Sequence, residues 1–457
     1  MTAVLLIYPF FRREHDRSRF RFPPLGIAYI AAGLREAGHP VQLLDCTFLN
    51  RDEAVGLALA AEADVVGISC LATMTEECLW FADRLRDHCT LLVAGGPMPT
   101  CDPGAFVEHF DVVVRGEGEQ AMLELLAAYQ NGSDLADVAG VVVGGRMRPM
   151  APASAAGEFA LPRQLTADLD ELPPPARDLF PNQSYIDDGR LRHGFSVTTV
   201  MSTRGCPHSC EFCSNVVFGG SFRERSPGKL LDEVEEALAL GYDRISFADD
   251  VFTQNRRRVA AICAEIGRRR LRFSWECLAH VEGFDLELAR ELKRAGCTRI
   301  FFGIESGDDE ILRLMNKKIT TAQARDAVVA AHQAGLEVGA FFILFYPGET
   351  DDTVLRTLRF AGSLPLDYLG LTMPYPLPGT ALAERVSDRG ARQWRQEGGG
   401  LIDHVLTFDA DFSQRKMRFG IIKGHIQFEI KRRLGRVAPP ALWLFEKPTD
   451  LVLRLLK

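Results

Sequence analysis

The feature that most constrains this 457-residue chain is a regular alternation of short apolar runs with longer amphipathic stretches, which occurs in two separate blocks. In the first block the apolar runs are each about five residues long, at 4–8, 41–45, 65–69, 91–96 and 112–116. Near-continuous apolar strands separated by helices are typical of a parallel sheet covered on both faces. Residues 1–145 are therefore expected to form a doubly wound, Rossmann-like α/β domain that binds ligands at the carboxyl ends of its strands.

The second block predicts a barrel over residues 195–384. Candidate strands lie at 196–202, 244–248, 272–275, 299–304, 339–344 and 368–372, with helical patterns between them. Six such units predict a partly or fully closed (β/α)6 barrel with its active site at the strand carboxyl ends. Small residues and clustered prolines mark 146–194 as a linker, and 385–457 reads as a mainly helical tail.

Composition restricts the protein class. Hydrophobic residues make up 47% and charged residues 25% of the chain, as in globular proteins, and the net charge of −8 provides no overall attraction to nucleic acid. We find no secretory leader and no apolar run long enough to span a membrane, so a cytoplasmic protein is expected. Eleven cysteines in such a chain argue against a disulfide framework.

Three cysteines have the spacing of metal ligands. Cys206, Cys210 and Cys213 lie in a turn opened by Gly205 and Pro207, so their thiolates can converge on an iron–sulfur cluster. Three ligands leave one iron of a [4Fe-4S] cluster open to a small chelating molecule, which suits a reacting cluster. A zinc site with His208 as fourth ligand, or three unrelated buried cysteines, are the alternatives.

The spacing C-x3-C-x-Phe-C closely resembles that of the radical S-adenosylmethionine (SAM) enzymes. The run from Gly95-Gly96-Pro97 to 114–119 resembles the cobalamin-binding domain that precedes many radical SAM barrels. This resemblance implies three cofactors, namely a [4Fe-4S] cluster, SAM and cobalamin, and an external one-electron reductant. It covers the chain to about residue 382.

The resemblance and the glycine-rich loops together give a candidate cobalamin site. Its expected residues are Ser69, Thr73, Gly95, Gly96, Pro97, Gly116, Glu117 and Gly118. The D-x-H-x-x-G signature that supplies an axial histidine in other cobalamin proteins is absent, because 45–50 reads Asp-Cys-Thr-Phe-Leu-Asn. We therefore expect cobalt without a histidine on its lower face; the alternative is a domain that has kept its shape and lost its ligand.

The expected SAM-binding residues end successive strands of the barrel or border the cluster. They are Phe212 beside the cluster and adenine, Asp249 or Asp250 at the amino group, Glu305 at the ribose and Gly348 in the turn against adenine. For each there is a plainer structural alternative, such as a core aromatic, a helix cap or a surface ion pair.

Four further residues are weaker candidates. Glu276 is of the same type as Glu305, and Arg223 and Arg225 either meet the SAM carboxylate or are ordinary surface charges. Tyr375 lies in a proline-rich segment that the resemblance places near the substrate. No catalytic residue is assigned.

The tail combines basic residues with Trp and Leu. Basic amphipathic helices of this kind can lie peripherally on a membrane or cover a lipophilic substrate, and they can equally form a cap packed on the barrel.

The whole pattern predicts cleavage of SAM to a 5′-deoxyadenosyl radical and cobalamin-mediated methyl transfer to an unactivated carbon of a small or lipophilic substrate. Ring cyclisation, ring contraction or oxidation with the same cofactors is the alternative. Methylthio transfer to RNA would require further cluster cysteines and a basic RNA-binding domain, and a cobalamin or cluster sensor is the non-enzymatic alternative.

Overall fold

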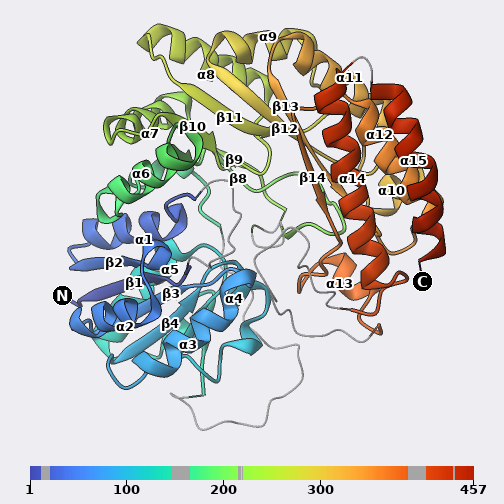
Figure 1. The fold of residues 1–457 in the computed structure, drawn as a ribbon. Coiled ribbons are helices and arrows are strands. Elements are labelled where there is room, and N and C mark those ends of the chain that lie inside the picture. Colours follow the sequence, from blue (N-terminus) through green and yellow to red (C-terminus); the bar gives the residue numbers. More distant parts are fainter. Residues whose placement is uncertain are drawn as a thin grey trace.

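The computed structural model describes residues 1–456 apart from 12–20, 146–164, 215–217, 219, 390–407 and 436–437. Much of the expected linker and the first part of the expected tail therefore lie outside the described residues. Figure 1 shows an N-terminal α/β domain in blue, a barrel running from green to orange, and two red C-terminal helices beside the barrel.

The N-terminal domain is built on a six-stranded sheet with the order β2-β1-β3-β4-β5-β6, parallel except for β6. Its strands are β1 (Val4–Tyr8), β2 (Val41–Asp45), β3 (Val65–Ser69), β4 (Leu91–Gly95), β5 (Val112–Val114) and β6 (Val141–Val143). Its longer helices are α1 (Leu25–Glu36), α2 (Arg51–Ala60), α3 (Thr75–Leu85), α4 (Pro97–Cys101) and α5 (Gly118–Asn131). Both sheet faces are buried, as the continuous apolar runs predict. Strand order reverses between β1 and β3, where open parallel sheets bind ligands.

Helix α6 (Asn182–His193) leads into the barrel, whose parallel sheet has the order β14-β13-β12-β11-β10-β7. Its strands are β7 (Val197–Val200), β10 (Arg244–Phe247), β11 (Ser274–Ala279), β12 (Cys297–Glu305), β13 (Glu337–Ile343) and β14 (Tyr368–Thr372). The order follows the chain from β7 to β14, and no pairing joins these two edge strands, so the described barrel is partial.

The barrel helices are amphipathic and cover the outside of the sheet. They are α7 (Pro227–Ala239), α8 (Arg256–Arg269), α9 (Leu286–Arg294), α10 (Asp309–Leu314), α11 (Thr321–Gln333) and α12 (Asp351–Ser363). A short antiparallel pair, β8 (Thr203–Arg204) and β9 (Arg223–Glu224), brackets the cysteine motif. The expected α/β class, Rossmann-like domain and partial six-stranded barrel are confirmed; β6, which is antiparallel, and the later start of β11 were not predicted.

Helix α13 (Ala381–Arg385) ends the barrel region, and the tail contains α14 (Gln414–Leu434) and α15 (Ala438–Leu455). Helix α14 packs against α12 and β14, and so covers one free edge of the barrel sheet (Figure 1). Two of its basic residues pair with acids of neighbouring helices: Lys416 pairs with Asp351 of α12 at 2.9 Å, and buried Lys423 pairs with Asp450 of α15 at 2.9 Å. Within the described part of the chain, no helix combines the length and apolarity that crossing a membrane requires.

Candidate active site between two domains

The cysteine loop lies at the carboxyl ends of the barrel strands and is held there by several elements. Gly205 opens it at φ +81°, and an added Cβ would lie 2.0 Å from the carbonyl oxygen of Ser221, so only glycine fits. The side-chain amide of Asn316 donates to the Oγ of Ser209 at 3.0 Å. The backbone N–H of Glu211 donates to the carbonyl of Met315 at 3.0 Å. The loop is therefore fixed by the segment between α10 and α11.

The side chain of Glu211 ties the same loop to two further elements. Its carboxylate accepts a hydrogen bond from the hydroxyl of Tyr346 at 2.8 Å, beyond β13, and pairs with Arg385 of α13 at 2.7 Å. Phe212 packs edge-on against Tyr346, with ring centroids 6.4 Å apart. Phe212 is thus both a packing residue of the loop and a neighbour of the cysteines.

The three thiols lie close enough to influence each other's ionisation. Burial raises the pKa of Cys206, while the backbone N–H of His208 lowers it, and the charges of Cys213 and Asp250 raise it. Burial also raises the pKa of Cys210, and the ammonium group of Lys317 opposes that change. Metal ligation requires thiolates, and the N–H donor and the nearby cation both favour them. The three cysteines therefore fit a cluster with one open iron.

The structure separates the two candidate aspartates. Ile245 and Phe247 of β10 face the helices, so the alternation of side chains sends Asp249 the same way and Asp250 into the lumen. Asp249 is buried and accepts hydrogen bonds from the backbone N–H groups of Ser202 and Thr203, at 2.7 and 2.9 Å. Asp249 therefore fastens the end of β7, whereas Asp250 is exposed beside Cys206.

A buried ion pair lies across the lumen mouth from Asp250. Glu305 ends β12 with φ +72°, after an irregularity in its pairing with β13, and its carboxylate lies 3.5 Å from Nζ of Lys317. Burial opposes the charge on Lys317, but Glu305 and Cys210 raise the pKa of that amine. The site thus presents two carboxylates and one cation around the cysteines. These charges complement the amine, ribose hydroxyls and carboxylate of SAM.

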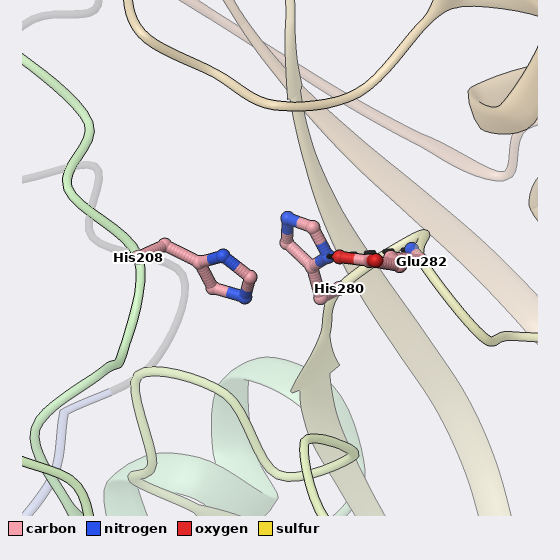
Figure 2. Close-up of side chains that lie close together, drawn as sticks. All are labelled: His208, His280 and Glu282. Carbon is pink, nitrogen blue, oxygen red and sulfur yellow. Dashed lines mark hydrogen bonds and ion pairs between the residues drawn. The ribbon is translucent and has the colours of Figure 1, made fainter.

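Two histidines stack next to the cysteine loop. Figure 2 shows His208 from the loop and His280 from the end of β11, with Glu282 beside His280. Their rings lie 3.9 Å apart at an angle of 15°. Burial, His208 and Lys317 lower the pKa of His280 to about 3, so it is neutral. Although ligand atoms of the three residues lie within 4.8 Å of one another, the in-plane lone pairs of parallel rings do not converge on one ion. His208 turns to His280 and Gln254 instead of completing a zinc site with the cysteines.

The remaining candidates of the barrel lie at different depths. Gly348, at φ +97°, is in the turn after β13, where an added Cβ would lie 2.8 Å from Leu314. Tyr375 follows β14 at the same end of the barrel and is partly buried. Glu276 lies at the opposite end of the lumen, where it pairs with Arg299 at 3.0 Å. Gly348 and Tyr375 thus adjoin the cysteine end, whereas Glu276 does not.

The N-terminal domain contributes a largely apolar cavity with an empty volume of about 920 Å³, part of it open to solvent. It lies at the carboxyl ends of β3, β4 and β5, between α1 and α5. Seven of the eight predicted cobalamin residues line it: Ser69, Gly95, Gly96, Pro97, Gly116, Glu117 and Gly118. The eighth, Thr73, is exposed and is not among the lining residues.

The cavity fits a flat, bulky ligand at two glycines. Gly26 and Gly95 line it, and nothing lies within 4 Å of where a Cβ would be at either position, so a ligand can approach the bare backbone there. Thr47 stands where the D-x-H-x-x-G signature has histidine. Its hydroxyl donates to Asp45 at 2.6 Å, in a buried position. The residues present therefore fit cobalamin without a histidine from this position.

The barrel forms one wall of this cavity. Met201, Arg204 and Phe218 line it from the barrel side. The guanidinium of Arg204, two residues before Cys206, pairs with Glu117 at 2.9 Å and with Glu119. The loop of the cobalamin-type cavity and the loop of the cysteines are therefore joined directly.

Two arginines considered for the SAM carboxylate belong to this domain interface instead. Arg223 pairs with Glu117 at 2.9 Å, and Arg225 pairs with the buried carboxylate of Glu233 and contacts the hydroxyl of Tyr29 at 3.1 Å. Although burial opposes its ionisation, hydrogen bonds from Arg223 and the charge of Arg204 lower the pKa of Glu117 to about 2. Both arginines stabilise the junction of the domains.

Sequence reasoning missed Lys317 and Arg204. Lys317 precedes a second lysine in a polar segment between two helices, which reads as surface, and only the fold brings it to the cysteines. The sequence did hold a hint of the Arg204 ion pairs, because a basic residue adjoins the cysteine motif and the loop 115–119 contains two glutamates. Whether these two loops meet, however, depends on how the domains dock.

Two family models match the chain in the same places. The model for the B12 binding domain matches residues 16–126, and the model for the radical SAM superfamily matches residues 200–361. These ranges contain the cavity of the first domain and the cysteine loop, Asp250, Glu305 and Gly348 of the barrel.

Relatives match over almost the whole length. An uncharacterized methyltransferase of Pyrococcus horikoshii is 33% identical over 426 residues, covering 90% of this chain and 89% of the relative. An anaerobic magnesium-protoporphyrin IX monomethyl ester cyclase of Rubrivivax gelatinosus is 26% identical, covering 95% and 84%. The solved structure of the cobalamin-dependent SAM radical enzyme OxsB, with aqua-cobalamin and SAM bound, superposes with a TM-score of 0.74 at 16% identity, covering 99% and 72%. The chain belongs to the radical SAM enzymes that carry an N-terminal cobalamin-binding domain.

Proposed function

We propose that this enzyme transfers a methyl group from SAM to an unactivated carbon of a small or lipophilic substrate. The observation that carries the proposal is the shared wall: Arg204 lines the cavity of the cobalamin-binding domain and stands two residues before Cys206. A substrate that lies between the two sites can then lose a hydrogen atom on the cluster side and receive a methyl group from the cavity side. The name of the Pyrococcus relative supports methyl transfer.

When bound, the cluster supplies one electron for cleavage of SAM and cobalamin carries the methyl group to be transferred. The chain positions the reactants. Asp250 and Glu305 accept hydrogen bonds from the amine and ribose of SAM, and Lys317 neutralises its carboxylate. Phe212 and the turn at Gly348 border the adenine, and Tyr375 lies on the substrate side. An external one-electron reductant completes the scheme.

A second reading keeps both cofactors for ring formation without methyl transfer. The observation in its favour is the similarity to the magnesium-protoporphyrin cyclase, which covers 95% of this chain. Fold and cofactor sites are the same in both readings, so only products separate them.

Products from trideuteromethyl-SAM test the proposal. The reconstituted enzyme is incubated with reductant and a small-molecule extract of the cells that contain the protein, and the products are analysed by mass spectrometry. Methyl transfer predicts a compound that gains one CD3 group, with S-adenosylhomocysteine and 5′-deoxyadenosine formed in equal amounts. Turnover that yields 5′-deoxyadenosine and an unlabelled product would establish the cyclase-type reading instead.

A further inference from the structure

The barrel lumen is layered by the alternation of its strands. On β12 the lumen-facing residues are Arg299, Phe301, Gly303 and Glu305, whereas Ile300, Phe302 and Ile304 are buried against the helices. Glu305 belongs to the layer at the cysteines, and Arg299 to a polar layer at the far end. Between them lies a layer made of aromatic rings.

This middle layer borders a cavity with an empty volume of about 1330 Å³, part of it open to solvent. The barrel contributes Leu278, Phe301, Phe341 and Gly370, and α14 contributes His425 and Phe428. The cavity therefore lies between the lumen and the C-terminal helix that covers the sheet edge.

Two phenylalanine rings lie flat against the sheet in this layer. Phe301 and Phe341 stack with centroids 5.5 Å apart at 16°. An added Cβ would lie 2.3 Å from the Phe301 ring at Gly339 and 2.5 Å from the Phe341 ring at Gly370, so these glycines make room for the rings. Phe341 remains 39% exposed although it is inside the barrel. An aromatic face is thus presented to empty space.

The cations of the cavity are already neutralised. Arg299 pairs with Glu276 at 3.0 Å and with Glu337 at 2.8 Å, and Arg432 pairs with Glu429 at 2.9 Å. The lining therefore offers no unmatched cation to an anionic group among its described residues. A neutral ligand suits it better than a phosphate or carboxylate.

One polar group of the lining lacks a partner. Nε2 of His425 is buried without a hydrogen-bond partner among the described residues, and burial lowers the pKa of this histidine, so the ring is neutral. A buried ring nitrogen of this kind gains stability from a hydrogen bond to a ligand or water. The cavity thus combines an aromatic floor with one neutral polar ring, beside charged side chains whose cations are already paired.

We propose that this cavity binds the flat, neutral, polycyclic body of the substrate, stacked on Phe341 and hydrogen-bonded to His425. The inference rests on the proposed function, because it assumes that the reacting carbon lies at the cysteine end of the lumen. Glu305 is four residues beyond Phe301 on β12, or about 13 Å at 3.3 Å per residue. Several fused rings span that length.

Equilibrium dialysis with defined probes tests the proposal on the full chain with cluster and cobalamin reconstituted, so that the other apolar cavity is filled. The probes are 1-pyrenemethanol, pyrene-1-carboxylate and 1-decanol, at neutral pH without SAM. We expect 1-pyrenemethanol to bind about tenfold more tightly than either of the others. Equal or tighter binding of the carboxylate or of the flexible chain would overturn the proposed ligand class.

Substitutions in the cavity test whether the probe binds in the lumen. Phe341→Ala is expected to weaken binding of 1-pyrenemethanol about tenfold, and Phe341→Trp to restore it, because a ring face is needed for stacking. His425→Phe should also weaken binding of 1-pyrenemethanol, because the hydroxyl of the probe loses its hydrogen-bond partner. Leu191→Ala, at an 87% exposed site elsewhere, should change nothing.

Unchanged binding by a folded Phe341→Ala protein, checked by its thermal midpoint, would overturn the proposal. If that variant does not fold, failure of a folded Phe341→Trp protein to bind the probe would overturn it as well. Because dialysis involves no turnover, tight binding without methylated product would count against the proposed function and leave this site intact.

Discussion

At the scale of single residues, the alternation of side chains along a strand decides which candidates reach the chemistry. Asp249 and Asp250 are adjacent and chemically identical, yet one fastens the backbone of Ser202 and Thr203 and the other lies beside Cys206. The same parity brings His280 and Glu305 to the lumen. The alternation can be read from the sequence, but deciding which of the two aspartates faces the lumen required knowing which residues of β10 are buried.

The two aspartates can be distinguished by a pair of matched variants. Asp250→Asn should weaken SAM binding about tenfold, since a charge-assisted hydrogen bond to the amine is lost, while stability is unchanged. Asp249→Asn should lower the free energy of unfolding by about 1–3 kcal/mol, because its backbone donors lose a charged acceptor. Equilibrium dialysis and urea unfolding measure the two effects; the opposite pattern would mean that Asp249 is the ligand.

Glu349 predicts a pH effect on stability. Burial raises the pKa of this carboxyl from 4.5 to about 8 in the folded protein. The folded state therefore holds a proton that the unfolded state releases, and stability falls as pH rises from about 4.5 to about 8. Glu349→Gln removes this titration, so its urea midpoint should fall less over that range. Parallel pH profiles for the variant and the natural protein would contradict the assignment.

At the scale of elements, the structure depends on loops that only the tertiary fold brings together. The cysteine loop is clamped by the segment between α10 and α11, by the turn after β13 and by α13. On its other side Arg204 and Arg223 join it to the start of α5 through Glu117. A shift of any of these elements would move the cysteines relative to the cobalamin-type cavity.

This junction predicts unequal effects for two arginines. Arg204→Met leaves the buried carboxylate of Glu119 without its cation, although Glu117 keeps Arg223, and should lower the free energy of unfolding by about 3–5 kcal/mol. Arg35→Met removes an exposed pair between α1 and Asp178 of the segment before the barrel, and should cost less than about 1 kcal/mol.

Guanidinium unfolding compares these two variants, and retained cobalamin is measured on the same samples. We expect Arg204→Met to lose cobalamin as well as stability. Equal stability losses for the two variants would show that the buried pair does not hold the domains together.

Local patterns were enough to predict most of the fold and part of the site. Apolar runs bounded by turns identify the strands, and the cysteine spacing identifies a motif, because both signals lie within short segments. Lys317 and the pairing of Arg204 with Glu117 depend on contacts between distant segments. The antiparallel β6 has only three residues, too few to show a direction.

At the scale of the whole molecule, two ligand-binding ends of parallel sheets meet at one interface, and a helical tail supports the barrel. The sequence of the tail predicts helices that lie on a membrane, cover a lipophilic substrate or cap the barrel. Its basic residues Lys416 and Lys423 pair with acids of the protein, and α14 covers the β14 edge. The structure thus gives no support for membrane contact.

The buried ion pair of Lys423 allows the contribution of the tail to folding stability to be tested. The side chain of Lys423 is 1% exposed, and its ammonium lies 2.9 Å from Asp450 of α15. Lys423→Met should lower the free energy of unfolding by about 1–3 kcal/mol, since Asp450 keeps its pair with Arg359, and Asp450→Leu added to it should recover part of that loss. Arg433→Met, at an exposed pair with Glu429, is the control. A loss no larger than the control's would mean that the tail is not part of the folded core.

The central claim is that one chain holds a three-cysteine cluster and cobalamin at a common interface. The most direct test is the ultraviolet–visible spectrum of anaerobically purified full-length protein, together with iron and cobalt analysis. The account predicts iron–sulfur absorbance with about four irons per chain and about one corrinoid. Iron–sulfur absorbance without corrinoid, after reconstitution with excess cobalamin, would contradict it.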